Sequence, residues 1–314
     1  MNVVVTGGCG HIGTYLIPML VRAGYEVINI TRGISRPYVE DEAWDYVTPV
    51  IMDREKDKGF AHKIAGMEPD IVVDLINFHI EDTKATAETL KGTKLSHYLF
   101  CSSVWAHGRA EILPADPADL QKAPLDDYGF NKFQSELYLR EQYHTAGFPA
   151  TIIMPGQGWT IMNPWANKTP VVFEKIAKGE EIFLPNFGME TLHHVHGEDV
   201  AQMFFKAITH RNQALGETFH AVGSQSITLY GYAKLMYGFF GKEPKIGFLP
   251  WKDWCEYIGD ETETSDTYFH IARSGFYSIE NARNLLGYEP RYTNVETIKA
   301  AVQSYVDRGV IKLN

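Results

Sequence analysis

The sequence predicts an α/β protein with a doubly wound parallel β-sheet and a smaller C-terminal α/β lobe. Short β-branched runs alternate with helical stretches through the first half, which is the pattern of βαβ units. A glycine-rich turn follows the first of these runs. The chain has 314 residues, of which 45% are hydrophobic, so it is long enough for about two domains with a sizeable core.

The runs that we expect to form strands of this sheet are residues 3–5, 26–30, 71–75, 98–101 and 150–154. In an open parallel sheet, ligands bind beyond the carboxyl ends of the strands. We therefore expect a ligand-binding domain over residues 1–155 and a mainly substrate-binding lobe over residues 156–314. A later segment, about 190–225, is expected to return to the first domain.

The glycine turn is the stretch Thr6-Gly7-Gly8-Cys9-Gly10-His11-Ile12-Gly13, between the first strand and a helical pattern. Glycines at positions 7, 10 and 13 permit a tight turn, a close approach of the backbone to a pyrophosphate, and close packing of the helix on the sheet. The unpaired N–H groups and the dipole of the helix N-terminus favour the negative charge of phosphates. Together these features predict a Rossmann-type domain that binds a dinucleotide.

The composition of the chain argues against several classes of partner. A formal net charge of −10 disfavours a nucleic-acid surface, which needs basic side chains to displace counterions from phosphates, and it disfavours anionic membranes. No apolar run approaches the ~20 residues that span a bilayer. The first strand begins at Asn2, so we expect a cytoplasmic protein without a signal peptide. Cys9, Cys101 and Cys255 are widely spaced, which favours reduced thiols over disulfides.

A tyrosine and a lysine four residues apart form the next candidate site. Tyr128 and Lys132 follow Asp126 and Asp127, either of which suits a helix N-cap, and their spacing places both side chains on one helical face. A lysine near the phenol can lower the pKa of the tyrosine by stabilising the phenolate, and an oxidised nicotinamide would add positive charge. The alternative is a surface helix with an ion pair between Lys132 and Glu136.

Two serines, Ser102 and Ser103, follow the expected strand at 98–101 and so lie at the sheet edge where a dinucleotide would bind. A hydroxyl there can hydrogen-bond a substrate oxygen, although for Ser102 a strand-end bond to the backbone is the alternative. The stretch Phe100-Cys-Ser-Ser-Val-Trp-Ala-His-Gly108 resembles the Ser-Ser-x-x-Val-Tyr-Gly segment of the extended short-chain dehydrogenase/reductase superfamily, within its NAD(P)-dependent epimerase/dehydratase family. The step of 25 residues from Ser103 to Tyr128 is typical of that family.

This resemblance implies roles for three residues: Ser103 as the catalytic hydroxyl, Tyr128 as the acid/base and Lys132 as its activator. It extends over nearly the whole chain. Residues 194–201 resemble the family's His-Val-x-Asp-Val-Ala stretch, and residues 278–290 resemble its Lys-Ala-x-x-x-Leu-Gly-Trp-x-Pro signature. Both of these stretches are mainly architectural.

The end of the second expected strand bears on the choice of cofactor. Members that prefer NAD usually carry an acid there that binds the ribose 2′-hydroxyl, whereas this chain reads Thr31-Arg32-Gly33, with Arg36 close behind. Arginine suits a 2′-phosphate through bidentate, charge-assisted bonds, so we expect NADP to be preferred over NAD. The alternative is that Arg32 stacks on adenine or points to water.

Further cofactor contacts follow from the resemblance. Asp53 resembles the residue that touches the adenine amino group, and residues 75–77 would line the nicotinamide ribose, although Asp74 and Asn77 are equally candidates for strand-end hydrogen bonds. The residues expected to contact the cofactor are Gly7, Gly10, His11, Ile12, Gly13, Thr31, Arg32, Arg36, Asp53, Arg54, Leu75, Ile76, Asn77, Tyr128, Lys132 and Pro155.

Departures from the family concern the substrate. Sugar-nucleotide epimerases tend to carry arginines that grip the substrate pyrophosphate, but Glu190 and Met154 occupy two such places, and the acidic stretch 259–274 holds only Arg273. A carboxylate at Glu190 would repel a diphosphate. A free sugar, a sugar acid or another small hydroxy or keto compound is therefore a comparable candidate.

Three histidines, His193, His194 and His196, lie close together in the sequence. Alternation along a strand places His194 and His196 on one face, with no supporting carboxylate cluster, so we expect no metal site. The side chains that we expect to contact substrate are Ser103, Trp105, Gln157, Trp159 and His194.

The sequence therefore predicts an NAD(P)-dependent oxidoreductase or epimerase that transfers hydride at a carbinol or carbonyl carbon of a small substrate. A nucleotide-sugar epimerase or dehydratase is the first alternative. A non-catalytic, dinucleotide-sensing interaction protein is the alternative from another class, because fold does not fix function. Aromatic residues over 130–143 suit a homodimer interface, or they pack on the sheet.

Overall fold

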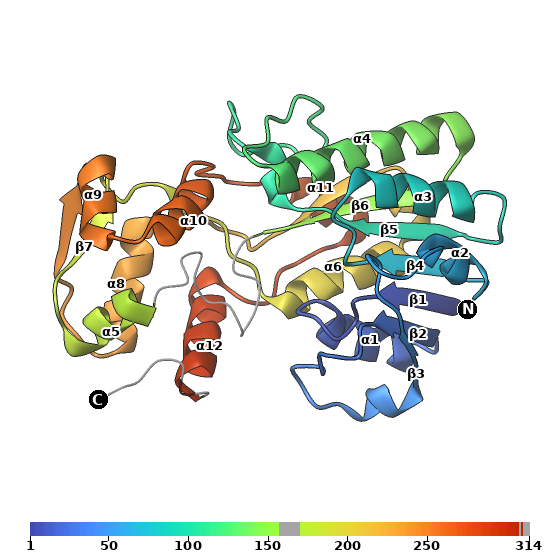
Figure 1. Ribbon diagram of the computed structural model, residues 1–314, viewed down its shortest axis with the longest axis horizontal. Helices are drawn as coiled ribbons and strands as arrows, with labels where there is room; N and C mark the ends of the chain where they lie inside the picture. Colours follow the sequence, from blue (N-terminus) through green and yellow to red (C-terminus); the bar gives the residue numbers. More distant parts are fainter. Residues whose placement is uncertain (157–169, 308, 310–314) are drawn as a thin grey trace.

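The computed structural model of the chain describes residues 1–156, 170–307 and 309 (Figure 1). Its centre is a parallel sheet whose described strands number seven, in the order β3-β2-β1-β4-β5-β6-β9. Every expected strand forms, so the Rossmann-type fold predicted from the sequence is confirmed. The strands are β1 (Asn2–Thr6), β2 (Glu26–Thr31), β3 (Val47–Ile51), β4 (Ile71–Asp74), β5 (His97–Cys101), β6 (Ala150–Pro155) and β9 (Thr218–Ala221).

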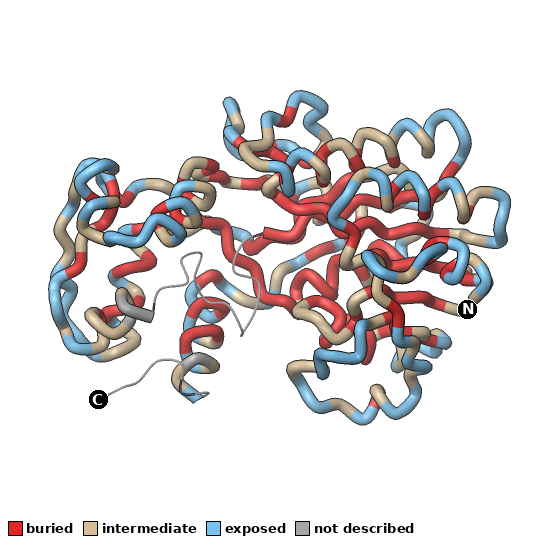
Figure 2. Tube along the Cα trace, viewed as in Figure 1, coloured by how far each residue is buried: buried red, intermediate tan, exposed pale blue. Residues whose placement is uncertain are grey.

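Helices cover both faces of this sheet, which explains its apolar sequence. β4, β5 and β6 are buried along their whole lengths, and Figure 2 shows the sheet as the main buried layer of the molecule. β-Branched residues suit strands that are buried on both faces. One face carries α1 (Gly13–Arg22) and α6 (Gly197–Thr209), and the other carries α2 (Phe60–Ala65), α3 (Ile80–Leu90) and α4 (Asp127–Ala146).

Segments after residue 190 contribute to the same core. β9 pairs with β6, with Thr218 opposite Ile152, and α6 packs along α1. α7 (Arg211–Ala214) and α11 (Glu280–Leu286) pack against each other beside β9. Tyr288, just after α11, is fully buried in this core.

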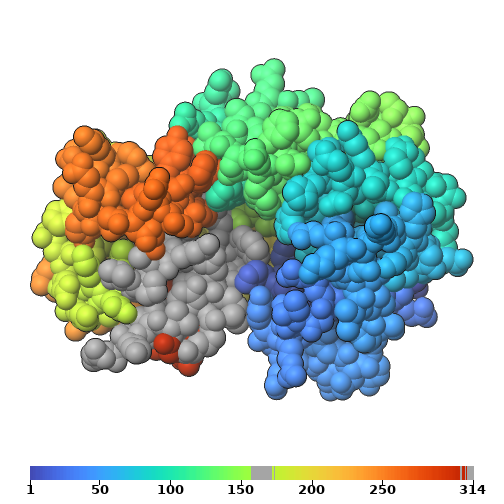
Figure 3. Space-filling model, viewed as in Figure 1, coloured from blue at the N-terminus to red at the C-terminus, as the bar shows by residue number. Residues whose placement is uncertain are grey.

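The smaller lobe has a second hydrophobic core of its own, which includes Ile176, Leu184 and Tyr232. Two short sheets form it: β7 (Ile182–Pro185) is parallel to β11 (Ile246–Leu249), and β8 (Thr191–Leu192) is antiparallel to β10 (Ile227–Thr228). The lobe appears as the orange and yellow-green mass beside the blue and cyan half of the molecule in Figure 3. Its helices are α5 (Pro170–Lys178), α8 (Leu229–Phe239), α9 (Trp251–Ile258), α10 (Glu261–Ile271) and α12 (Asn294–Asp307).

In the described part of the chain, no helix is both long and apolar enough to cross a lipid bilayer.

Candidate active site

A cavity of about 230 Å³ lies at the carboxyl edge of the sheet, between the glycine turn and the start of α4. The ends of β1, β4, β5 and β6 meet there, so residues far apart in the sequence share one space. The cavity is lined by Gly7, Gly10, His11, Ile12, Leu75, Ile76, Phe78, Cys101, Ser102, Ser103, Tyr128, Lys132 and Pro155.

The glycine turn is shaped for a close ligand. Gly7 has a φ of +78°, and a Cβ there would lie 2.4 Å from Cγ2 of Ile76. A Cβ at Gly13 would lie 2.3 Å from the backbone of Gly8, so α1 can begin this close to the turn only with glycine. Ile12 precedes α1 and makes no side-chain cap hydrogen bond, so no cap side chain fills the place of a phosphate. These residues fit the pyrophosphate of a dinucleotide.

Ser103 is held by the short 3-10 helix η2 (Val104–His107) that it caps. Its Oγ accepts a hydrogen bond from the backbone N of Trp105 at 3.2 Å. A hydroxyl that accepts in this way keeps its own proton for donation. The Ser103 side chain also hydrogen-bonds Tyr128, so it lies within reach of an oxygen beside the phenol.

Tyr128 is the second residue of α4, and the cap of that helix fixes its position. Oδ1 of Asp126 accepts from the backbone N of Gly129 at 2.7 Å, which satisfies one of the unpaired N–H groups at the helix start. The residue is 39% exposed, but its hydroxyl end is enclosed. Burial therefore raises the pKa of Tyr128, as do the neighbouring Cys101 and Asp126, while the hydrogen bond from Ser103 lowers it.

Lys132 lies one turn further along α4 and is 1% exposed. Its Nζ donates to the backbone carbonyls of Asn77 and Cys101, at 2.6 Å each, and lies 5.6 Å from the centre of the Tyr128 ring. Burial lowers the pKa of Lys132 to about 8. The hypothesis of a surface helix is therefore wrong, because this face of α4 is buried and the lysine faces the cavity.

The expected alternative partner, Glu136, has other contacts. Its Oε2 forms an ion pair with Nζ of Lys122 at 2.5 Å, and its Oε1 accepts a hydrogen bond from the Ser102 hydroxyl. The alternative prediction of an ion pair between Lys132 and Glu136 is thus wrong. The prediction that the Ser102 side chain bonds the backbone is also wrong, because its hydroxyl donates to Glu136. The pair of Glu136 and Lys122 instead fixes Ser102, and with it the start of the Ser103 segment, against α4.

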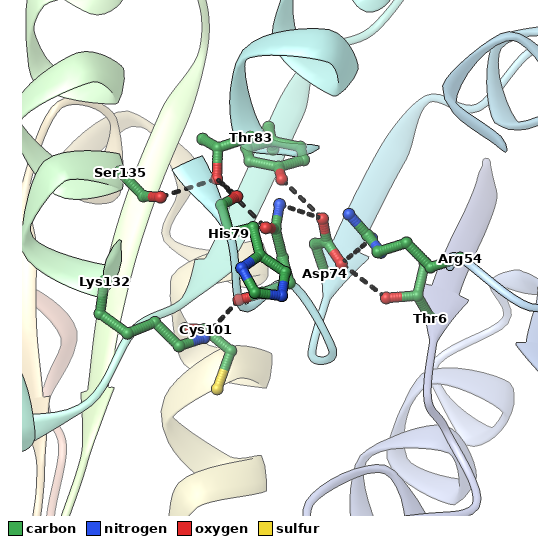
Figure 4. A network of polar contacts seen from close by, with 10 residues as sticks. Thr6, Arg54, Asp74, His79, Thr83, Cys101, Lys132 and Ser135 are labelled. Carbon is green, nitrogen blue, oxygen red and sulfur yellow. Dashed lines mark hydrogen bonds and ion pairs between the residues drawn. The ribbon is translucent and has the colours of Figure 1, made fainter. Parts of the chain in front are cut away.

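Asp74, at the end of β4, is the centre of a buried network below the cavity (Figure 4). It accepts hydrogen bonds from Thr6 at 2.7 Å, Tyr98 at 2.8 Å and Asn77 at 3.0 Å, and Nη2 of Arg54 lies 2.5 Å from its Oδ1. Burial alone would raise the pKa of Asp74, but Arg54 and these bonds hold it below its usual range. We expected Arg54 to contact the cofactor, but it pairs with Asp74 and does not line the cavity. A buried carboxylate needs a counter-charge, and Arg54 supplies it.

Other expected contacts lie outside this cavity. Arg32 and Arg36 are exposed beyond β2, and the side chain of Asp53 bonds its own loop at the backbone N of Glu55, 3.0 Å away. Thr31 similarly accepts from the backbone N of Gly33 at 3.1 Å. Asn77 contributes through its carbonyl and its bond to Asp74 rather than by lining the cavity.

Of the residues expected to contact substrate, some lie near the cavity and others do not. His194 is 1% exposed and stacks on Tyr232 in the smaller lobe, with ring centres 5.6 Å apart, so the structure places it in packing contacts and not in the cavity lining. Trp105 is half-buried beside Tyr128. Gln157 and Trp159 fall outside the described residues. The residues that the structure describes contain no cluster of three metal-ligating side chains.

Comparisons with known proteins identify the family of the chain. A family model described as the NAD dependent epimerase/dehydratase family matches residues 3–221. The chain belongs to this family. The resemblance noted in the Ser102–Ser103 segment is thereby confirmed, and the protein is an NAD-dependent enzyme of the epimerase/dehydratase type.

Proteins that are similar to this chain are named for widely different activities. The Arabidopsis thaliana chloroplast stem-loop binding protein of 41 kDa b is 26% identical over 99% of this chain and 81% of its own length. The sterol-4-alpha-carboxylate 3-dehydrogenase, decarboxylating, of Bos taurus is 23% identical over 96% of this chain and 91% of its own. UDP-glucuronic acid 4-epimerase from Bacillus cereus, solved with UDP-glucuronic acid and NAD, shares the fold with a TM-score of 0.73, at 16% identity over 98% of this chain and all of that one (100%).

Proposed function

We propose that this family member transfers hydride at a carbinol or carbonyl carbon of a sugar, a sugar acid or a similar small hydroxy or keto compound. The observation that supports this proposal is the convergence of Ser103, Tyr128 and Lys132 on a cavity whose other wall is the glycine turn. The glycine turn and Pro155 would hold the dinucleotide, and its nicotinamide would accept or supply the hydride.

Each of the three side chains has a distinct task in this proposal. When substrate binds, Ser103 donates its proton in a hydrogen bond to the substrate oxygen in place of its bond to Tyr128, and Tyr128 takes up or returns the hydroxyl proton. Lys132 spends two of its three N–H groups on backbone carbonyls, which leaves one for a ribose hydroxyl of the cofactor. Because burial raises the pKa of Tyr128, the phenolate depends on the positive charge of Lys132 and of the oxidised nicotinamide.

The finer choice of cofactor is NADP over NAD. Arg32 and Arg36 are exposed beyond the end of β2, where we expect them to bind a 2′-phosphate, and the end of β2 carries no carboxylate to repel one. A solved structure of similar fold contains NAD. The preference for NADP is therefore proposed for this chain alone, on the basis of its arginines.

For the substrate, Glu190 favours a compound without a diphosphate. Its Oε1 accepts from Asn186 at 2.7 Å, and its Oε2 is buried without a hydrogen-bond partner among the described residues. A second negative group near it would be repelled. The alternative, a nucleotide-sugar substrate, is suggested by the UDP-glucuronic acid bound in the Bacillus cereus structure.

A thermal-shift screen with cofactor present tests the proposal, because ligands that bind the folded state raise its melting temperature. Sugars, sugar acids and nucleotide sugars would be compared in the presence of NADP⁺ and of NAD⁺. We expect a shift from a sugar or sugar acid. A strong shift from a UDP-sugar alone would contradict the interpretation of Glu190. A nucleic-acid stem-loop is included because the Arabidopsis thaliana relative is named a stem-loop binding protein, and a shift from the stem-loop alone would favour a binding protein over an enzyme.

A further inference from the structure

Arg273, just after α10 of the smaller lobe, is buried beside the start of the helix that carries Tyr128. Its Nη2 lies 2.8 Å from Oδ2 of Asp126, and its side chain is 0% exposed. Its guanidinium carbon lies 3.6 Å from the centre of the Trp105 ring, so the cation stacks on the indole face. Its Nε and Nη1 have no hydrogen-bond partner in the described part of the chain. One carboxylate and one aromatic face therefore hold this buried charge.

Both partners of Arg273 also contact the tyrosine segment. The second oxygen of Asp126 caps α4 through Gly129, directly beside Tyr128. The Trp105 ring meets the Tyr128 ring nearly edge-on, at 77° and 6.1 Å between centres. A Cβ at Gly129 would lie 2.6 Å from the Trp105 carbonyl, so η2 and α4 approach closely at this point. Arg273 thus touches the two groups that border the tyrosine.

We propose that Arg273 is a positioning residue for Tyr128: by pairing with Asp126 and stacking on Trp105, it links the smaller lobe to the acid/base tyrosine and cancels the negative charge at the start of α4. The proposal rests on the acid/base role of Tyr128 given above. Arg273 itself is not among the residues that line the cavity.

The charges around the phenol explain why this pairing matters. The groups that face Tyr128 are Cys101 from β5, Ser103 at the start of η2, Lys132 on α4 and Asp126 at its cap, with His270 and Arg273 of the smaller lobe reaching it through Trp105. Burial and Cys101 raise the pKa of Tyr128, and the carboxylate of Asp126 raises it further and so also opposes the phenolate. A cation paired with that carboxylate offsets its field, and an unpaired carboxylate would act at full strength.

The test measures the ionisation of Tyr128 directly, without a substrate. Tyrosine isotopically labelled at Cζ reports phenol ionisation by NMR, and Tyr128→Phe identifies the signal. Titrations of the full chain, free and with NAD⁺ bound, would be recorded for Arg273→Met, Asp126→Asn and the double variant. Asparagine still caps a helix, so Asp126→Asn keeps the cap and removes the charge. Arg283→Met, which breaks an ion pair with Glu280 on α11, is the matched control.

We expect Arg273→Met to raise the apparent pKa of Tyr128 by roughly 0.5 to 1 unit, Asp126→Asn to lower it, and the double variant to fall between them. Arg283→Met should leave it unchanged. A purely structural role for Arg273 predicts a lower melting temperature with an unshifted titration, and that result would overturn the proposal.

If Arg273→Met does not fold, the titration of Tyr128 can be measured in Arg273→Lys instead. It retains the charge beside Asp126 but loses the planar stack, so we expect a wild-type titration with a lower melting temperature. A titration shifted upward as far as in a neutral variant would contradict the charge argument. If the wild-type enzyme transfers no hydride while these shifts appear, the proposed function fails and the role of Arg273 in setting the ionisation of Tyr128 stands.

Discussion

Lys132 shows at the scale of one residue how a site can oppose stability. Its ammonium group is buried among the rings of Phe78, Phe100 and Tyr128 and is satisfied by two backbone carbonyls. Burial disfavours the charged form, which is why the pKa of Lys132 falls. In the proposed mechanism the phenolate of Tyr128 requires this same charge, so a group that destabilises the fold would be kept for its role in the site.

This environment predicts a pH-dependent contribution to stability. The pKa of Lys132 is about 8 in the folded protein and 10.5 in an unfolded chain. Between these values the unfolded chain binds more protons, so the unfolding free energy rises with pH across this window, by about 3 kcal/mol if the full shift applies. Below the window the penalty is complete. Urea unfolding of wild type and Lys132→Met should therefore show a difference in unfolding free energy that changes by about this amount between roughly pH 7 and pH 11. Parallel pH profiles for the two proteins would contradict the burial of a charged lysine.

Arg32 carries a second prediction at this scale. If it binds a 2′-phosphate, Arg32→Ala removes a charge-assisted contact worth roughly 1.5–3 kcal/mol, which is a loss of roughly 10- to 100-fold in NADP⁺ affinity. NAD⁺ affinity should change little. Calorimetry with both cofactors checks this, with Arg22→Ala as the control, because Arg22 is occupied by Asp41. An equal loss for both cofactors would instead indicate that Arg32 stacks on adenine.

The sequence predicts a part of the site more readily when the interacting residues lie close together along the chain. Strand ends and helical spacing, which are local features, make Ser103, Tyr128 and Lys132 candidates, and the resemblance to the family implies their roles. The ion pair of Arg54 with Asp74 spans 20 residues, and that of Arg273 with Asp126 spans 147. No local pattern encodes such pairs. They arise when the sheet order and the smaller lobe bring distant segments together.

The glycine turn is the element on which the cofactor site depends. Gly13→Ala would place a methyl group 2.3 Å from the backbone of Gly8, and backbone cannot move aside as a flexible side chain can. We expect a loss of about 2 kcal/mol or more in stability and a much weaker binding of the dinucleotide. Denaturant unfolding and calorimetry measure the two effects.

Gly66 provides the matched control for this substitution. It ends α2 with φ −63° and ψ −15°, which alanine adopts readily, and a Cβ there meets atoms no closer than 3.4 Å. Gly66→Ala should leave both stability and cofactor binding close to wild type. If Gly13→Ala behaved like Gly66→Ala, the close approach of α1 to the turn would not be needed for the site.

At the scale of the whole molecule, the chain has two hydrophobic cores, one around the central sheet and one in the smaller lobe. The central sheet was predictable because alternating β and α periods recur through the first half of the chain. A smaller C-terminal lobe was also predicted, but its strand pairing was not, since β7 pairs with β11 from a segment more than sixty residues later in the sequence, at Ile182 opposite Ile246. Arg273 of the smaller lobe stacks on Trp105, and Trp105 in turn contacts Tyr128 at the sheet edge.

Isotope transfer tests the central claim most directly. The enzyme would be incubated with NADPH or NADH deuterated at the transferable position and with a panel of keto sugars and keto acids, and deuterium in the product would be measured by mass spectrometry. The wild-type enzyme should label at least one product, whereas Tyr128→Phe should bind the cofactor with similar affinity but transfer less than about one hundredth as fast. Transfer at the wild-type rate by Tyr128→Phe would contradict the assignment of the acid/base to this cavity.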